Sequence, residues 1–249
     1  MRPVLVTIPI SHFCEKARWA LDRARIDFDE EAHLPFLHML ATRRAFGRTT
    51  PQLRTESGVL LDSQAILRWV DSRVPTGLYP ADSARRADVE TFAKRCDDVL
   101  GPAIRRFAYH HLLPRMDLLE PLFTRGVSAR ERALYPVMKP AVPWLMRKAM
   151  RIDAATAERS RTRVLTILDE VDARLGDGRP YLGGDAFTVA DLTFGALASP
   201  LVAPPEHPVG TPPFDAIPDA LAREIVEARE RPAGRLITRL YAEDRLREV

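Results

Sequence analysis

Residues 4–18 read VLVTIPISHFCEKAR, and the change of pattern within this stretch decides how the chain begins to fold. Residues 4–8 form a short, apolar, β-branched run, which predicts a buried strand. Residues 14–24 repeat small apolar side chains at helical spacing, which predicts a helix directly after the strand. A helix N-terminus offers unpaired N–H groups and a partial positive charge, so it stabilises a thiolate placed there. Ser11 precedes the helix, and its hydroxyl is free to point at such a ligand.

The residues that follow extend this beginning into a small unit of alternating strands and helices. Gly58 is expected to turn a hairpin by adopting a positive φ. The expected elements are a strand over 28–34, a short helix over 36–46, hairpin strands over 51–55 and 59–61, and a helix from Ser63. The N-terminal part therefore reads βαβαββα.

Beyond the linker at 75–80 the sequence is almost entirely helical in pattern. One long apolar stripe runs from Val89 to Phe107, and a last helix is expected over 218–229. Five prolines between residues 112 and 153 predict that this region is broken into short helices. Its segment 144–150 is amphipathic and basic, which fits a membrane surface or, as we favour, packing against the other helices.

Composition and charge exclude several classes of protein. Among 249 residues, 37 Lys and Arg against 34 Asp and Glu leave a net charge of +3, too small to argue for nucleic acid. The two cysteines lie far apart and form no CxxC or zinc pattern, which favours a reducing, cytoplasmic compartment. The first residues lack the pattern of a signal peptide, and no apolar run is long enough for a transmembrane helix.

Four sequence elements together resemble the glutathione transferase family. The resemblance is closest to its serine-type classes (theta, zeta, tau) and their bacterial relatives. The elements are SHFCEKAR at 11–18, TTPQL at 49–53, DSQAI at 62–66 and YLGGDAFTVAD at 181–191, which are similar to the family's S-x-F-C-x-K-x-R, T-V-P-x-L, E-S-x-A-I and F-T-x-A-D elements. Their order and spacing also match the family.

The resemblance implies a fold class and an activity. The fold is expected to combine a thioredoxin-like α/β domain over 1–77 with an all-helical domain over 82–249. The implied activity adds the thiolate of glutathione to a hydrophobic electrophile, with glutathione as co-substrate and without a metal. A homodimer is implied as well.

The resemblance also implies roles for individual residues. Ser11 would donate a hydrogen bond to the sulfur, which favours the thiolate. The peptide bond before Pro51 would be cis, and the backbone of Thr50 would pair with the cysteinyl part of glutathione. Asp62 and Ser63 would bind the γ-glutamyl end, although the family usually has Glu where Asp62 stands, and Ser63 is expected to cap its helix as well.

Further candidates surround these positions. His12, Phe13, Tyr109 and His110 are predicted contacts of the second substrate. Adjacent histidines on a helix point about 100° apart, so His110 and its neighbour make a poor metal site. Thr188 and Asp191 are read as a structural capping box.

Two other functions stay open at this stage. The fold can serve as a binding or interaction module without turnover. Alternatively, Cys14 can act as a low-pKa thiol that forms a mixed disulfide with glutathione, in a redox transferase. Against the second alternative, a lone cysteine at this position is more often a small buried hydrophobic residue.

Overall fold

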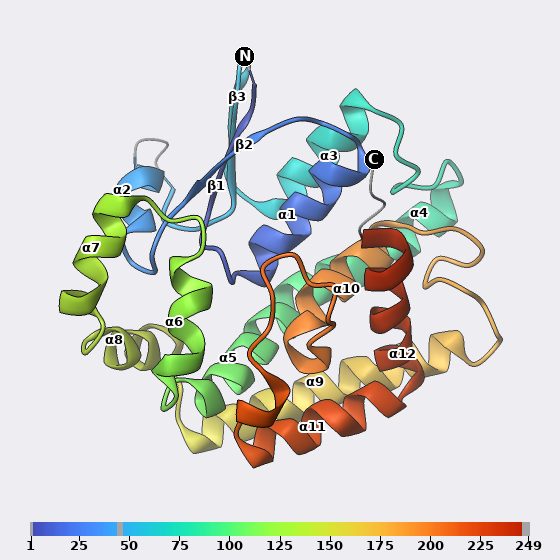
Figure 1. The fold of residues 1–249 in the computed structure, drawn as a ribbon. Coiled ribbons are helices and arrows are strands. Elements are labelled where there is room, and N and C mark those ends of the chain that lie inside the picture. The colour runs from blue at the N-terminus through green and yellow to red at the C-terminus, as the bar shows by residue number, and fades with distance from the viewer. Residues whose placement is uncertain (1, 44–46, 246–249) are drawn as a thin grey trace.

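The chain is described by a computed structural model over residues 2–43 and 47–245. Its N-terminal part is a four-stranded sheet with three helices (Figure 1). The elements are β1 (Val4–Thr7), α1 (His12–Arg23), β2 (Asp29–Ala32), α2 (His38–Thr42), β3 (Gln52–Thr55), β4 (Gly58–Leu60) and α3 (Ser63–Arg73).

The sheet has the strand order β2-β1-β3-β4, and its topology confirms the expected βαβαββα sequence of elements. β1 pairs in parallel with β2 and antiparallel with β3, so Leu5 lies opposite both Glu30 and Leu53. Gly58 has a φ of 131° at the hairpin turn, as expected. The second strand and second helix are shorter than predicted, and the predicted end of that helix, Phe46, lies outside the described residues.

Helices form the remainder of the described chain. They are α4 (Ser83–Arg95), η2 (Cys96–Leu100), α5 (Gly101–Leu112), α6 (Met116–Thr124), α7 (Ala129–Met138), α8 (Val142–Met150), α9 (Ala154–Leu175), α10 (Val189–Val202), η3 (Phe214–Ala216), α11 (Asp219–Glu230), α12 (Pro232–Arg239) and η4 (Leu240–Arg245). The long stripe predicted from Val89 is interrupted by η2, a π-helical turn. The sequence reading missed α12 and η4.

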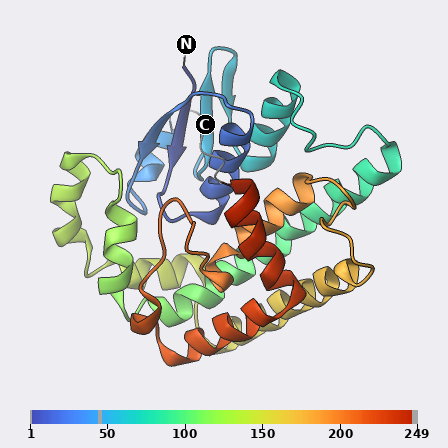
Figure 2. The ribbon, with the colours of Figure 1, turned by 45° about the vertical axis from the view of Figure 1, so that its right-hand side comes forward.

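Helix α10 lies at the centre of the helical layer (Figures 1 and 2). It is mostly apolar, as a helix surrounded by other elements is expected to be, and nearly every side chain on it is buried. Gly195 lets the indole of Trp19 on α1 come close, because a Cβ there would lie 3.2 Å from the ring. The two halves of the chain therefore share one continuous core.

The proline-containing region folds as three short helices, α6 to α8, as predicted. Pro121 lies inside α6 and Pro136 inside α7, while Pro143 stands at the first turn of α8, where it is tolerated. The basic, amphipathic α8 packs with Met146 buried and leaves Trp144 exposed. No helix within the described residues is long and apolar enough to cross a membrane.

The segment that begins α7 is tied to the end of the sheet. Glu131 accepts hydrogen bonds from the backbone N–H of Leu34 at 2.9 Å and from Nδ1 of His33 at 2.5 Å. Val127 forms a parallel bridge with Ala32 at the end of β2. These contacts fix α6 to α8 beside the loop that follows β2.

The linker between α3 and α4 is packed rather than loose. Leu78 is fully buried, and its carbonyl accepts a hydrogen bond from Val189 N at 2.8 Å. The division into residues 1–77 and 82–249, proposed from the sequence, falls at this linker.

Candidate functional site

Ser11 stands where β1 ends and α1 begins, at one wall of a large cavity. Its backbone is extended, and its Oγ accepts a long hydrogen bond of 3.4 Å from Cys14 N, so Ser11 caps the helix. This contact uses Oγ as an acceptor, which leaves the hydroxyl proton available to a ligand.

The cavity has a volume of about 630 Å³ and lies between the N-terminal part, which contains the sheet, and the helical part. Its lining contains a mainly polar set of residues (the polar end) and a mainly apolar set (the apolar end), and Ser11 lines the same cavity. The polar end is lined by Thr50, Asp62, Ser63, Gln64, Lys94, Asp97 and Asp98. The apolar end is lined by Phe13, Phe36, Met39, Pro102, Tyr109, Met146 and Met150, together with Arg105.

The structure brings the predicted polar residues together. The Thr50–Pro51 bond is cis, as the resemblance implied, and both residues line the cavity. Asp62, rather than Ser63, caps α3, because its Oδ1 accepts from Ala65 N at 2.8 Å. Ser63 is instead the first helical residue. The prediction that Ser63 caps its helix is therefore wrong, and its hydroxyl is not occupied by the cap.

An ion pair missed from the sequence closes the polar end. Lys16 is buried, and its Nζ donates to both carboxylate oxygens of Asp97, at 2.8 and 2.7 Å. Gln64 Nε2 donates to the same carboxylate at 2.8 Å. A lysine inside the otherwise apolar face of α1 was the sequence signal for a buried partner.

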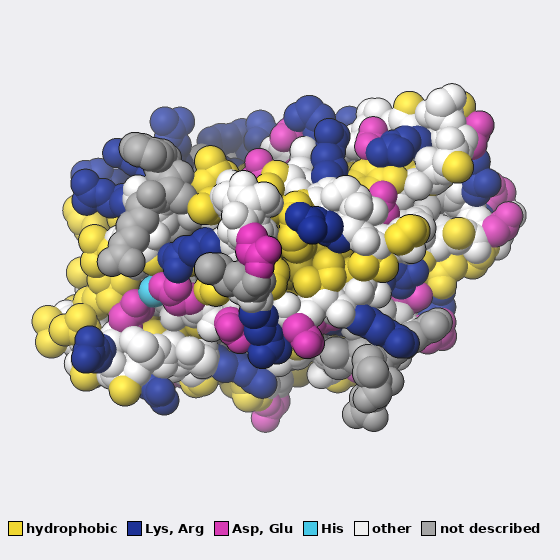
Figure 3. Space-filling view, turned by 90° about the horizontal axis from the view of Figure 1, so that it is seen from above, with side chains coloured by type: hydrophobic (Ala, Val, Ile, Leu, Met, Phe, Trp, Pro, Cys, Tyr) yellow, Lys and Arg dark blue, Asp and Glu magenta, His cyan; other side chains and the backbone are white. Residues whose placement is uncertain are grey.

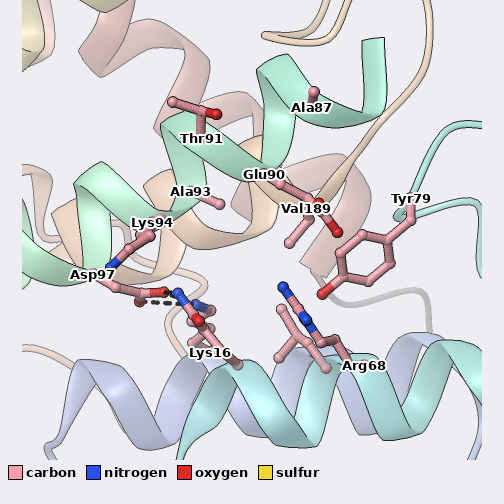
Figure 4. Close-up of a pocket in the computed structure, with 12 residues that line it drawn as sticks. Lys16, Arg68, Tyr79, Ala87, Glu90, Thr91, Ala93, Lys94, Asp97 and Val189 are labelled. Atoms are coloured by element: carbon pink, nitrogen blue, oxygen red, sulfur yellow. Dashed lines mark hydrogen bonds and ion pairs between the residues drawn. The ribbon is translucent and has the colours of Figure 1, made fainter. Parts of the chain in front are cut away.

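A second, smaller cavity of about 290 Å³ lies behind this ion pair (Figure 4). Figure 4 shows Arg68 of α3 opposite Glu90 of α4, with Tyr79 beside them. Lys16, Gln64 and Asp97 line it as well, so they separate the two cavities. Of these two cavities, Ser11 and Thr50 line only the larger.

His12 lines the larger cavity but acts as an anchor between the domains. Its ring is buried, and Nε2 donates a hydrogen bond of 3.1 Å to the carbonyl of Gly101 on α5. Burial, with a smaller contribution from the nearby Arg105 charge, lowers the pKa of His12 to about 3. The imidazole is therefore neutral in the folded protein.

We expect His12 to make the protein sensitive to acid. The pKa is lower in the folded chain than the unfolded value near 6.5, so protonation favours unfolding. The stabilisation is complete above pH 6.5 and is lost as the pH falls towards 3, by about 2–3 kcal/mol at pH 4.5. Urea unfolding at several pH values measures this loss.

The His12→Gln variant is the comparison, because glutamine keeps an N–H donor for Gly101 but does not titrate. Its free energy of unfolding should fall less steeply with acid than that of the wild type. A His110→Gln variant, outside the cavity, should follow the wild type. Parallel profiles for wild type and His12→Gln would contradict this assignment.

The structure does not place every predicted residue at the cavity. Phe13 lies at the apolar end, against Gly101, where a Cβ would come within 2.5 Å of the phenyl ring. Tyr109 lines the same end. His110 does not line the cavity and contacts the ring of His111 instead. The sequence reading missed Arg105, one turn before Tyr109 on the same helix.

Cys14 lacks the properties of a reactive thiol. Its side chain is fully buried, and burial raises the pKa of the thiol despite the opposing effect of the nearby Arg18 charge. A redox thiol needs access and a lowered pKa, so these observations disfavour the redox alternative.

Other kinds of site gain no support from the structure. In the part of the chain that is described, no three His, Cys, Asp or Glu side chains are grouped so that they could hold a metal ion. Lys and Arg side chains lie among Asp and Glu side chains over much of the face seen from above (Figure 3). That face carries no field of a single sign such as a nucleic acid would require.

Comparison with known proteins adds two family matches. Residues 5–77 match the model of the glutathione S-transferase N-terminal domain, and residues 154–223 match that of the glutathione S-transferase C-terminal domain. None of the curated proteins compared matches the sequence.

Solved structures share the fold at low sequence identity. A glutathione S-transferase from Xanthobacter autotrophicus Py2 superimposes with a TM-score of 0.61 at 17% identity, over 98% of this chain and 95% of that chain. A theta class enzyme from Xanthomonas axonopodis pv. citri, with glutathione bound, gives 0.56 at 20%, over 94% and 95%. A third, from Methylobacterium radiotolerans JCM 2831 in complex with glutathione sulfonate, gives 0.56 at 21%, over 94% and 93%.

Proposed function

The chain belongs to the glutathione S-transferase family, and from this premise we propose that it conjugates glutathione to a hydrophobic electrophile in the larger cavity. The observation that carries the proposal is that Ser11, at the start of α1, lines one cavity together with a mainly polar and a mainly apolar set of residues. Such a division suits a charged tripeptide on one side and an apolar partner on the other.

The polar end offers suitable groups for the tripeptide. Ser63 and the free N–H groups at the start of α3 suit the γ-glutamyl carboxylate. The backbone of Thr50 is proposed to pair with the cysteinyl residue, as an added strand would. The sulfur then lies near Ser11, where a donated hydrogen bond favours the thiolate.

The reaction needs an activated thiol and an electrophilic carbon held close to its sulfur. The thiolate sulfur forms a bond to the electrophilic carbon, and the leaving group departs with the electron pair of the bond that breaks. The apolar end holds the electrophile against the sulfur, which makes the encounter effectively intramolecular. The homodimeric state and the cytoplasmic location implied by the resemblance belong to the same proposal.

The first test is calorimetric titration with reduced glutathione of the wild type and of Ser63→Ala. We expect binding that weakens in the variant, because the carboxylate loses a hydroxyl donor. Absence of binding at millimolar glutathione would contradict the proposal.

Ser11→Ala is expected to slow conjugation about 10- to 100-fold near neutral pH, because the thiolate loses a charge-assisted hydrogen bond. The pKa of the bound thiol should rise by about one to two units, so the defect should shrink at higher pH. The dependence of kcat/KM on pH measures this shift. Ser57→Ala, in the exposed turn between β3 and β4, is the control and should behave like the wild type. A pH profile unchanged by Ser11→Ala would overturn the role of Ser11.

One observation favours a second candidate, a binding module without turnover. Asp62 is already engaged by Ala65 N, and both oxygens of Asp97 are engaged by Lys16. The polar end thus has few free carboxylate oxygens for the ammonium of glutathione. This alternative predicts saturable ligand binding in the calorimeter together with no conjugation of any electrophile.

A further inference from the structure

The apolar end of the larger cavity contains one arginine that has no carboxylate partner among the described residues. Arg105 lines the cavity from α5, and its Nε is buried without a hydrogen-bond partner. Among the residues the structure describes, no carboxylate forms an ion pair with it. Burial consequently lowers the pKa of Arg105 below its ordinary value.

Arg105 is partly exposed with its Nε buried, whereas the fully buried Lys and Arg side chains of the described chain are paired. Lys16 binds Asp97, Arg18 binds Glu30, and Arg245 binds Glu15. A buried guanidinium without a counter-ion is unfavourable, since the charge loses hydration and gains little in return. Arg105 therefore differs from these three, because it lines the larger cavity and has no carboxylate partner among the described residues.

The surroundings of Arg105 favour a ligand with both an apolar body and a negative group. Phe13, Met146 and Met150 offer apolar surface, and Tyr109 stands one helical turn after Arg105. Burial raises the pKa of Tyr109 to about 12, so the phenol stays neutral and can donate a hydrogen bond. The two side chains together offer donors to a single oxyanion.

We propose that Arg105 determines substrate specificity by binding a carboxylate on the hydrophobic electrophile. The planar guanidinium suits a carboxylate, with which it forms two parallel hydrogen bonds. The electrophilic carbon then lies towards Ser11, while the apolar body contacts the side chains of α5 and α8. This inference rests on the proposed function, because it names the class of electrophile for the same cavity.

The test compares a chloronitrobenzoate with its methyl ester, and each kcat/KM is divided by the rate constant of the uncatalysed reaction with glutathione, because the ester group activates the ring more strongly than the carboxylate. For the wild type, this normalised kcat/KM should be higher for the acid than for the ester. Arg105→Met should lower kcat/KM for the acid about tenfold or more and change it little for the ester, while Arg105→Lys should retain part of the preference. Arg147→Met, on the exposed side of α8, is the matched control and should keep the wild-type preference.

Two results would overturn the inference. The first is a wild type with no preference for the acid. The second is an equal loss for acid and ester in Arg105→Met, since Arg105 would then act on the thiolate or on the fold instead of on the carboxylate.

A binding measurement separates this inference from the proposed function. Nitrobenzoate and its methyl ester lack the leaving group, so their binding can be measured without turnover. Preferential binding of the acid that Arg105→Met abolishes would support the inference even if no electrophile is conjugated. Equal binding of acid and ester would overturn it even if conjugation occurs.

Discussion

Replacing Arg245 with methionine is expected to destabilise the folded chain by about 3–5 kcal/mol. Arg245 lies in η4 near the end of the chain, and its Nε donates to Glu15 of α1 at 2.5 Å. Both side chains are only 1% exposed. Removing the cation would leave the Glu15 carboxylate buried without its main counter-ion, and such a charge is far more unfavourable than the loss of a surface pair.

Further contacts of Arg245 also connect it to α1. One terminal nitrogen lies 2.8 Å from Asp22, and the guanidinium lies over the ring of Trp19. Both residues belong to α1, so Arg245 holds η4 against the helix that Ser11 caps. Loss of Arg245 should therefore loosen the contact of the C-terminal segment with α1.

Urea unfolding monitored by circular dichroism measures the effect of Arg245→Met. Lys94→Met, which breaks an exposed pair with Asp98, is the control and should change stability little. The double variant Glu15→Gln/Arg245→Met should recover much of the loss, because no uncompensated charge remains. A double variant that is less stable than Arg245→Met would contradict the electrostatic explanation.

Replacing Asp191 with alanine should be about equally destabilising, by roughly 3–5 kcal/mol. Asp191 is fully buried, and its carboxylate accepts from Leu182 N at 2.7 Å and from Thr188 N and Oγ1, both at 2.9 Å. The variant would leave two buried N–H groups without an acceptor, each unfavourable by about 1–3 kcal/mol. The start of α10, at the centre of the core, would lose its cap.

Asp153 offers a matched control for Asp191. It forms the same kind of capping box at the start of α9, where Asp153 and Thr156 bond reciprocally, but its site is exposed to water. Water can replace the lost acceptor there, so Asp153→Ala should destabilise the chain much less. Thermal unfolding of both variants measures the difference. Equal losses of stability would show that burial does not determine how much a capping box stabilises the folded chain.

Local patterns predicted much of the fold, and the family resemblance named several of the residues that line the cavity. The strand at Val4, the helix after Ser11 and the box at Thr188 depend on neighbours within a few residues, so the sequence alone indicates them. The cap of α3 was assigned one residue too late because Asp62 and Ser63 are both good caps. The extended backbone at Asp62, with φ of −147°, decides between them.

Contacts between distant residues left no comparable signal. Arg245 and Glu15 are 230 positions apart, and Lys16 and Asp97 are 81 apart. Only packing of the whole chain shows which charges meet. Arg105 was missed for a related reason, since an arginine on a helix usually lies on the outer surface and only the folded chain shows that this one lines a cavity.

The attachment of α6 to α8 has a consequence for how the cavity can change. Residues 113–153 lie outside both segments that match the family models, yet Met146 and Met150 line the apolar end. Glu131 of α7 holds these helices to the residues that follow β2, and its side chain does not line the cavity. A different set of helices that kept a carboxylate at this point would form a new wall of the cavity that Ser11 lines, and the residues around Ser11 would stay unchanged.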